Sequence, residues 1–223
     1  LTTFQHRQPD RIAVDYGSTP VTGIHVLAVE KLREYYGLEK RLVRVIEPYQ
    51  MLGAIDNDLV EVLGVDVIGL SPASNIFGIK NYGPHKEFRT FWNQTVLVPE
   101  GFNTKLDYNG DLLIYPEGDM SVDPCGKMPK ASFFFDAVIR QDPINEATLD
   151  PADNLEEFNP FTEADLAYWR ERVNSVKGTG KAIIANMGGT ALGDIALVPG
   201  LNLKHPKGIR DIAEWYMSII ARP

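Results

Sequence analysis

Short apolar runs alternate with stretches of helical periodicity along the chain. Apolar residues recur at helical spacing from Ile24 to Tyr35, and Gly37 is placed to end a helix there. Mostly apolar runs with the length of a buried strand begin at Ile12, Val65, Phe133 and Ala182. Because helices separate most of these runs, the pattern predicts a parallel α/β sheet.

Three further helices are predicted from their caps and periodicity. The first follows the cap candidate Asp56. The second begins at Thr162, which forms a capping-box pattern with Asp165 three residues later. The third carries an apolar stripe from Ile209 to Ile219.

The middle of the chain has a different pattern. Residues 96–98, 104–108 and 111–115 are short strand candidates, and Asn109-Gly110 joins the last two. Asn-Gly between such runs is a strong hairpin signal, because a type I′ turn needs positive φ at both central residues. We therefore expect an antiparallel β-hairpin insertion over residues 93–130.

The strand count sets the expected fold. A TIM (β/α)8 barrel needs eight parallel strands and about 250 residues. This chain offers four core strands in 223 residues, part of which the insertion uses. We expect residues 1–223 to be the N-terminal half of a single TIM-barrel domain. The chain starts without Met and ends directly after a predicted helix, which also indicates a fragment.

Charge and cysteine content narrow the function classes. The 22 basic and 30 acidic side chains give a net charge of −8, which disfavours a nucleic-acid-binding role. Cys125 is the single cysteine and cannot form an internal disulfide, so a cytoplasmic setting is expected. No run approaches the roughly 20 apolar residues of a membrane span.

Polar residues follow the predicted strands. In parallel α/β folds the catalytic and binding residues commonly lie at the carboxyl ends of the strands. Glycine at such a strand end also lets a ligand approach the backbone closely. The residues that we expect to bind substrate there are Asp15, Tyr16, Ser71, Asn186 and Gly188.

Two further side chains are candidates for chemistry. Asp136 follows three phenylalanines, and an apolar surround would raise its pKa and suit acid–base catalysis. The alternative is a helix-capping or loop aspartate. His25 lies in the first turns of the first helix and faces either a ligand or a structural partner. No metal-ligand spacing of His and Cys is present, so no metal site is predicted.

Three segments carry a resemblance to a known family. Arg7–Val14, Leu63–Gly69 and Ala182–Gly189, with Trp215-Tyr216 further on, resemble the uroporphyrinogen decarboxylase family. The likeness is to its branch of corrinoid-linked methyltransferases, such as the methylcobamide:coenzyme M methyltransferases. It implies a TIM barrel and places this chain over the first half.

Two departures from the decarboxylase pattern favour the methyltransferase branch. The decarboxylases are expected to carry an arginine-bearing segment after the first strand and a catalytic aspartate after the second. The corresponding stretches here are Asp15–Thr19 and Gly69–Pro72, which lack both the arginines and that aspartate. The resemblance therefore disfavours porphyrinogen decarboxylation.

The resemblance implies transfer of a methyl group between a corrinoid carried by a partner protein and a small acceptor, a thiol or similar. Zinc is expected only in the missing C-terminal half, held by a His-x-Cys pair and a distant Cys. Two alternatives stay open: a decarboxylase-like lyase, and a catalytically silent domain that binds a corrinoid or tetrapyrrole. A homodimer is also left open.

Overall fold

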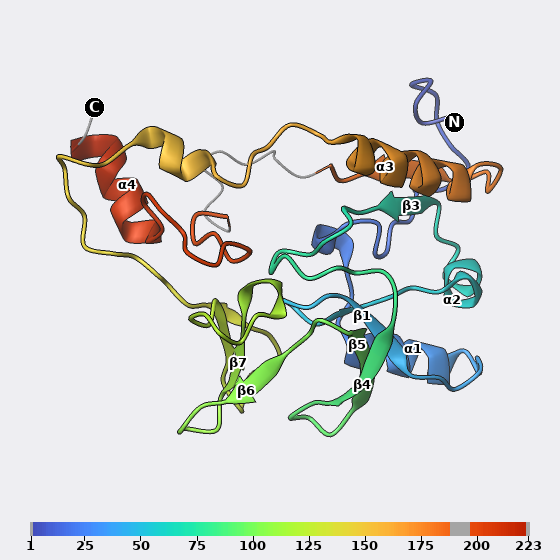
Figure 1. The fold of residues 1–223 in the computed structure, drawn as a ribbon. Coiled ribbons are helices and arrows are strands. Elements are labelled where there is room, and N and C mark those ends of the chain that lie inside the picture. The colour runs from blue at the N-terminus through green and yellow to red at the C-terminus, as the bar shows by residue number, and fades with distance from the viewer. Residues whose placement is uncertain (1, 188–196, 222–223) are drawn as a thin grey trace.

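The computed structural model describes residues 2–187 and 197–221 of the chain. That part contains three small sheets with strand orders β2-β1-β5-β4, β10-β3 and β6-β7-β8-β9 (Figure 1). Its α-helices are α1 (Val26–Tyr35), α2 (Asn57–Val62), α3 (Glu163–Val176) and α4 (Ile212–Ala221). Short 3-10 turns lie at Pro20–Thr22, Pro116–Gly118 and Pro151–Leu155.

The first sheet is built around a parallel pair. Its strands are β1 (Val43–Glu47), β2 (Leu52–Gly53), β4 (His85–Arg89) and β5 (Thr95–Pro99). β1 runs parallel to β5, while β2 and β4 are antiparallel to their neighbours. Helix α1 covers this sheet through the buried side chains of Val26 and Val29.

The third sheet contains the predicted hairpin. Its antiparallel strands are β6 (Thr104–Leu106), β7 (Leu112–Ile114), β8 (Gly126–Met128) and β9 (Asp136–Ala137). The β6–β7 hairpin is confirmed, but residues 96–98, expected in the same insertion, belong to β5 of the first sheet and run parallel to β1. Only Gly110 of the Asn-Gly pair has a positive φ. The Asp107 carboxylate accepts from the Asn109 amide, and the Gly110 amide bonds to the Asp107 carbonyl, which gives a type I turn with a glycine bulge.

The second sheet is the parallel pair β3 (Val67–Leu70) and β10 (Ala182–Ala185). Helix α3 lies along it (Figure 1) and packs through Trp169 and Val176 against Leu70. These three residues form a small core of their own. A much larger core joins the first and third sheets, with Val45, Val96 and Ile114 among its buried members.

The expectation of half a TIM barrel is wrong. The described residues form three separate sheets rich in antiparallel pairs, and only β1–β5 and β3–β10 pair in parallel there. Of the four expected parallel core strands, one is missing and another is short and antiparallel. Ile12–Gly17 forms no strand, and the run from Phe133 contributes only the two-residue antiparallel strand β9.

Hydrogen bonding explains both differences. The Val14 carbonyl accepts from the Asp66 amide, but the Val14 amide bonds to the Asp66 carboxylate in place of a main-chain carbonyl, so no ladder continues. The Phe135 amide bonds to the Tyr49 carbonyl, and the Phe133 carbonyl bonds to the His25 ring. Backbone groups used in this way are unavailable to a parallel neighbour.

The predicted helices are present. Helix α1 ends at Tyr35 just before Gly37, which has φ +65°. Helix α2 has Asp56 as its N-cap residue, and α3 begins with the expected capping box between Thr162 and Asp165. Local signals of this kind depend only on neighbouring residues, which is why they were sufficient.

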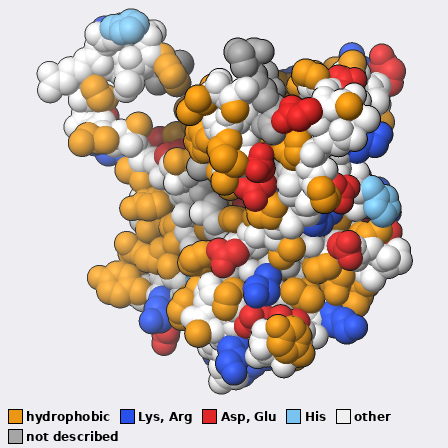
Figure 2. Space-filling model, turned by 90° about the vertical axis from the view of Figure 1, so that its left-hand side faces the viewer, with side chains coloured by type: hydrophobic (Ala, Val, Ile, Leu, Met, Phe, Trp, Pro, Cys, Tyr) orange, Lys and Arg blue, Asp and Glu red, His pale blue; other side chains and the backbone are white. Residues whose placement is uncertain are grey.

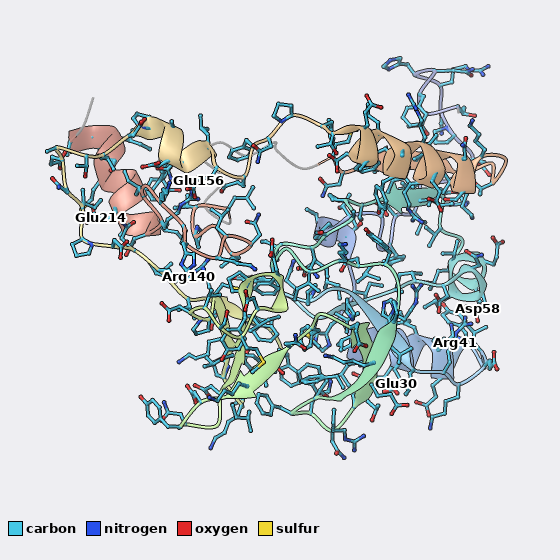
Figure 3. All side chains as sticks on the ribbon, in the orientation of Figure 1. Glu30, Arg41, Asp58, Arg140, Glu156 and Glu214 are labelled. Atoms are coloured by element: carbon cyan, nitrogen blue, oxygen red, sulfur yellow. The ribbon has the colours of Figure 1, made fainter. Side chains whose placement is uncertain are left out.

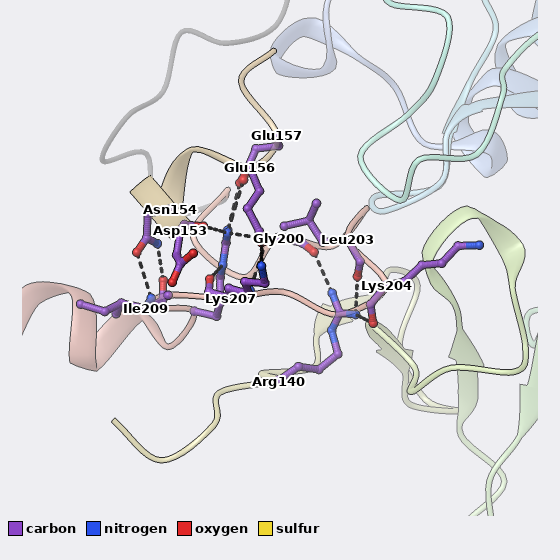
Figure 4. Close-up of polar contacts among 12 residues, drawn as sticks. Arg140, Asp153, Asn154, Glu156, Glu157, Gly200, Leu203, Lys204, Lys207 and Ile209 are labelled. Atoms are coloured by element: carbon purple, nitrogen blue, oxygen red, sulfur yellow. Dashed lines mark hydrogen bonds and ion pairs between the residues drawn. The ribbon is translucent and has the colours of Figure 1, made fainter. Parts of the chain in front are cut away.

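Two arginines hold the C-terminal region together (Figure 4). Arg210 is 1% exposed and contacts the carboxylates of Glu156 and Glu157. Arg140 donates to the carbonyls of Leu203, at 2.6 Å, and of Gly200, at 2.7 Å. These contacts fasten the loop that precedes α4 to the segments around Arg140 and Glu156.

Helix α4 is apolar and has no buried residue. Figure 2 shows the side of the molecule that carries it, where hydrophobic side chains are exposed among charged ones. Its Tyr216, Met217, Ile219 and Ile220 are each at least half exposed. In the described residues, no helix combines the length and the apolar character that crossing a membrane requires.

Candidate functional site

The three segments that lead to the predicted site lie next to one another. The Arg11 guanidinium binds both carboxylate oxygens of Asp66 at 2.7 Å, and it holds the pKa of that carboxyl below its ordinary value. The Asp66 amide donates to the Val14 carbonyl, and the Ala182 amide donates to the Asp66 carbonyl. Asp66 thus joins the N-terminal segment to β3 and β10.

The N-terminal segment runs in the same direction as β3. Val14 lies beside Asp66, and further on the Ser18 backbone lies against Gly69. A Cβ atom on Gly69 would come within 1.8 Å of the Ser18 carbonyl oxygen, so only glycine permits this approach. The carboxyl ends of the three segments therefore meet at one edge.

Two of the predicted binding residues, Ser71 and Asn186, lie at this edge, which we call the β3–β10 edge, and Asp15 is joined to it through Ser18, whose backbone lies against Gly69. Asp15 accepts from the Ser18 hydroxyl at 2.5 Å and from its amide at 3.3 Å. Ser71 directly follows β3, and the Asn186 amide after β10 donates to the Leu70 carbonyl. Carboxylate, hydroxyl and amide groups at one sheet edge are suited to hold a small polar ligand.

The rim of the β3–β10 edge is apolar. Tyr16 follows Asp15 and is about half exposed, as is Met187 after Asn186. Gly188, the remaining predicted binding residue, lies outside the described residues. The arrangement combines a few polar groups with exposed apolar surface, as ligand sites commonly do.

An aromatic pair that sequence analysis missed lies beside Ser71. The Tyr168 hydroxyl on α3 donates to the Ser71 carbonyl at 2.9 Å, and burial raises the pKa of Tyr168. The Tyr82 ring is 5.9 Å from the Tyr168 ring, and the Lys80 ammonium lies over Tyr82. Tyr168 precedes the buried Trp169, but nothing in the sequence places Tyr82 at this edge.

His25 has a structural role. Its Nδ1 accepts from the Leu27 amide at 3.2 Å and caps α1, so Nε2 carries the hydrogen that bonds to the Phe133 carbonyl at 3.1 Å. The ring also packs on Trp92 and Phe133. Burial lowers the pKa of His25, which keeps the ring neutral. Both nitrogens are occupied, and the structural alternative fits.

Asp136 lies on a different sheet from the β3–β10 edge. It is exposed in β9 and pairs with Lys127 of β8. Of the three preceding phenylalanines only Phe135 is buried, while Phe133 and Phe134 are about half exposed. The expected apolar surround is therefore absent, and β3 and β7 lie apart in Figure 1. The negative charge of Asp136 adds to burial in raising the pKa of Tyr49.

Glu47, which the sequence analysis does not single out, is a carboxyl group with a raised pKa. It ends β1 and is half-buried, and burial raises its pKa despite bonds from the Tyr49 amide at 3.0 Å and the Gln50 amide at 2.9 Å. Its position at the end of an apolar strand was the available signal. Glu47 stabilises the turn that leads into β2.

A shallow cavity lies between α2 and the start of β1. It is lined by Arg41, Arg44 and the residues Ile55–Asp58. Arg41 binds Asp58 (Figure 3). Arg33 binds the same carboxylate, and its guanidinium holds the pKa of that carboxyl well below its usual range. The charges pair with one another, so this cavity offers little to an added ion.

A metal centre does not fit the described residues. Among residues 2–187 and 197–221, no three His, Cys, Asp or Glu side chains are placed to hold a metal ion. Cys125 is buried, and burial raises the pKa of its thiol to about 12, so it is a poor metal ligand.

Comparisons with protein-family models, curated proteins and solved structures found no match.

Proposed function

We propose that this chain acts in methyl transfer between a corrinoid carried by a partner protein and a small thiol-type acceptor, at the β3–β10 edge. One observation carries the proposal. Three segments of the family resemblance, Arg7–Val14, Leu63–Gly69 and Ala182–Gly189, are far apart in sequence, yet their described parts are hydrogen-bonded neighbours, whereas Trp215-Tyr216 lies apart from them on α4. A likeness arising by chance would not require these segments to share one edge.

The residues of this edge have distinct roles in the proposal. Ser71 and Asn186 bind polar groups of the acceptor, and the Asp15 carboxylate takes the thiol proton as the sulfur gains the methyl group. The corrinoid of the partner supplies that methyl group and keeps the electron pair of the broken cobalt–carbon bond. Tyr16 and Met187 provide apolar surface for the partner.

No step is assigned to zinc, because the described residues do not offer its ligands. A cytoplasmic setting, in which a thiol such as Cys125 stays reduced, is part of the proposal.

The test is methyl transfer from methylcobalamin to a panel of small thiols. Purified protein should speed the loss of methyl–cobalt absorbance and produce the methyl thioether, detected by mass spectrometry. Asp15→Asn keeps an acceptor for Ser18 but removes the base, and we expect the rate to fall about a hundredfold. Asp136→Asn makes the same chemical change on another sheet and should leave the rate within about twofold.

Two results would contradict the proposal. Equal effects of the Asp15 and Asp136 substitutions would remove the β3–β10 edge from the chemistry. Binding of methylcobalamin without any thioether would exclude methyl transfer and favour a domain that only binds the corrinoid.

A further inference from the structure

The chain exposes far more surface than its mass requires. Its accessible area is 13500 Å². A folded monomer of 24.9 kDa has an expected area of about 10,200 Å². Part of the excess comes from the exposed residues 2–8, but apolar side chains on β10 and α3 add to it. An excess of roughly 3,300 Å² over the whole chain leaves room for the 800 Å² that each partner buries in a standard interface.

The side of β10 that faces away from β3 can form backbone hydrogen bonds with another strand. This lateral side is distinct from the β3–β10 edge, which lies at the carboxyl ends of the strands. The amides of Ala182 and Asn186 donate to carbonyls of the β3 segment. Because alternate residues of a strand point their N–H and C=O groups to opposite sides, those of Ile183 and Ala185 point away from β3. Among residues 2–187 and 197–221, β10 is the last strand of its sheet, so these groups form its open edge.

The β3–β10 pair is also too small to be stable with its present cover. Parallel sheets are normally covered on both faces, and two strands alone are marginal. Here Ile183 and Ile184 are 45% and 41% exposed, and in the described part of the chain the local core has three buried residues. Leu166 and Val173 of α3, the helix packed on this sheet, are about 40% exposed as well.

We propose that a second copy of this chain covers this surface, with the two β10 strands paired antiparallel across a twofold axis at Ile184. In that register the outward groups of Ile183 face those of Ala185 in the second copy, and the reverse, which gives four hydrogen bonds. The two Ile184 side chains meet as a non-hydrogen-bonded pair on one face. Two sheets of two strands become one sheet of four.

A second copy suits this edge better than an open-ended assembly. The twofold pairing consumes the β10 edge of both chains, so the contact closes after two copies. The Ile183–Ala185 pairs place a large side chain opposite a small one, and Ile184 meets its own kind, so the surface is self-complementary.

The mass of the protein in solution, measured by light scattering on a sizing column, tests this. The full chain should elute as a dimer, with about twice the 24.9 kDa mass. Ile184→Lys places two ammonium groups opposite each other at the axis, and like charges directly opposed destabilise a strand pair. We expect the dimer dissociation constant to rise at least about tenfold. Ala185→Pro removes an outward N–H with no charge change and should have the same effect.

The control is Leu106→Lys. Leu106 is 55% exposed and lies on β6, which is the edge strand of another sheet. This variant should remain dimeric. Circular dichroism of each variant should match the unmodified chain. A monomeric wild-type chain at 100 μM, a larger open-ended assembly, or equal dissociation of the Leu106→Lys variant would each overturn the proposal.

Discussion

Replacing Arg210 with methionine removes a buried guanidinium and keeps most of the side-chain volume. Arg210 is 1% exposed, binds Glu157 at 3.0 Å and donates to the Asp153 carbonyl at 2.8 Å. The Glu157 side chain is itself only 13% exposed. Removing one partner of such a buried pair leaves the other charge uncompensated, which costs about 3–5 kcal/mol.

Urea unfolding followed by circular dichroism at pH 7 measures this cost. We expect the free energy of unfolding of Arg210→Met to fall by about 3 kcal/mol with an unchanged dependence on urea. Replacing Glu157 with leucine in the same chain removes the stranded carboxylate and should recover part of the loss. The matched control is Lys207→Met, since Lys207 is 68% exposed and 4.0 Å from Glu156, and it should cost less than about 0.5 kcal/mol.

The result that would refute this argument is a cost below about 1 kcal/mol for Arg210→Met, the range of surface ion pairs. A double variant less stable than the single variant would also contradict it, because the stranded charge would then not be the cause. Hydrogen exchange over residues 150–157 and 197–211 would locate the loss, which we expect to be confined to these segments.

Three further predictions concern single positions. His25 is neutral in the folded state, so its contribution to the free energy of unfolding should be complete above about pH 7. This contribution should decline as the pH falls from the ordinary pKa of 6.5 towards the lowered pKa of the folded state. His25→Asn keeps the cap of α1 and should abolish this pH dependence in urea titrations. Gly69→Ala should cost about 3 kcal/mol or more by thermal unfolding, because its Cβ would collide with the Ser18 backbone, whereas Gly101→Ala meets only a side-chain methyl at 3.2 Å and should cost clearly less. Cys125 should react with a thiol reagent at least about a hundredfold faster in urea than in the native state, and equal rates would contradict its burial.

The sequence alone determined the elements that depend on neighbouring residues. The periodicity up to Tyr35, the Thr162 capping box and the turn around Gly110 each formed where predicted. Caps, turn glycines and helical periodicity act within a few residues, so their physical chemistry is contained in the local sequence. The apolar runs at Val65 and Ala182 form the strands β3 and β10 as predicted, but their direct pairing was not predicted, because the barrel order places the Phe133 strand between them.

Tertiary structure decided how strands pair and which polar groups are buried. Ile12–Gly17 has the pattern of a strand, but the Val14 amide in this segment donates to the Asp66 carboxylate. The barrel expected from that pattern does not form. Asp136 follows three phenylalanines and is nevertheless exposed, while burial raises the pKa of Glu47 at the end of β1.

The physical reason is that burial and hydrogen-bond partners are supplied by residues distant in sequence. An arginine such as Arg210 reads as a surface residue, because burying an unpaired charge is costly. Only the arrival of Glu157, 53 positions away, makes its burial tolerable. An apolar run likewise predicts a strand with a buried face, but it does not predict the partner strand. Which strand pairs with it, and whether the pair is parallel or antiparallel, is decided by the tertiary fold.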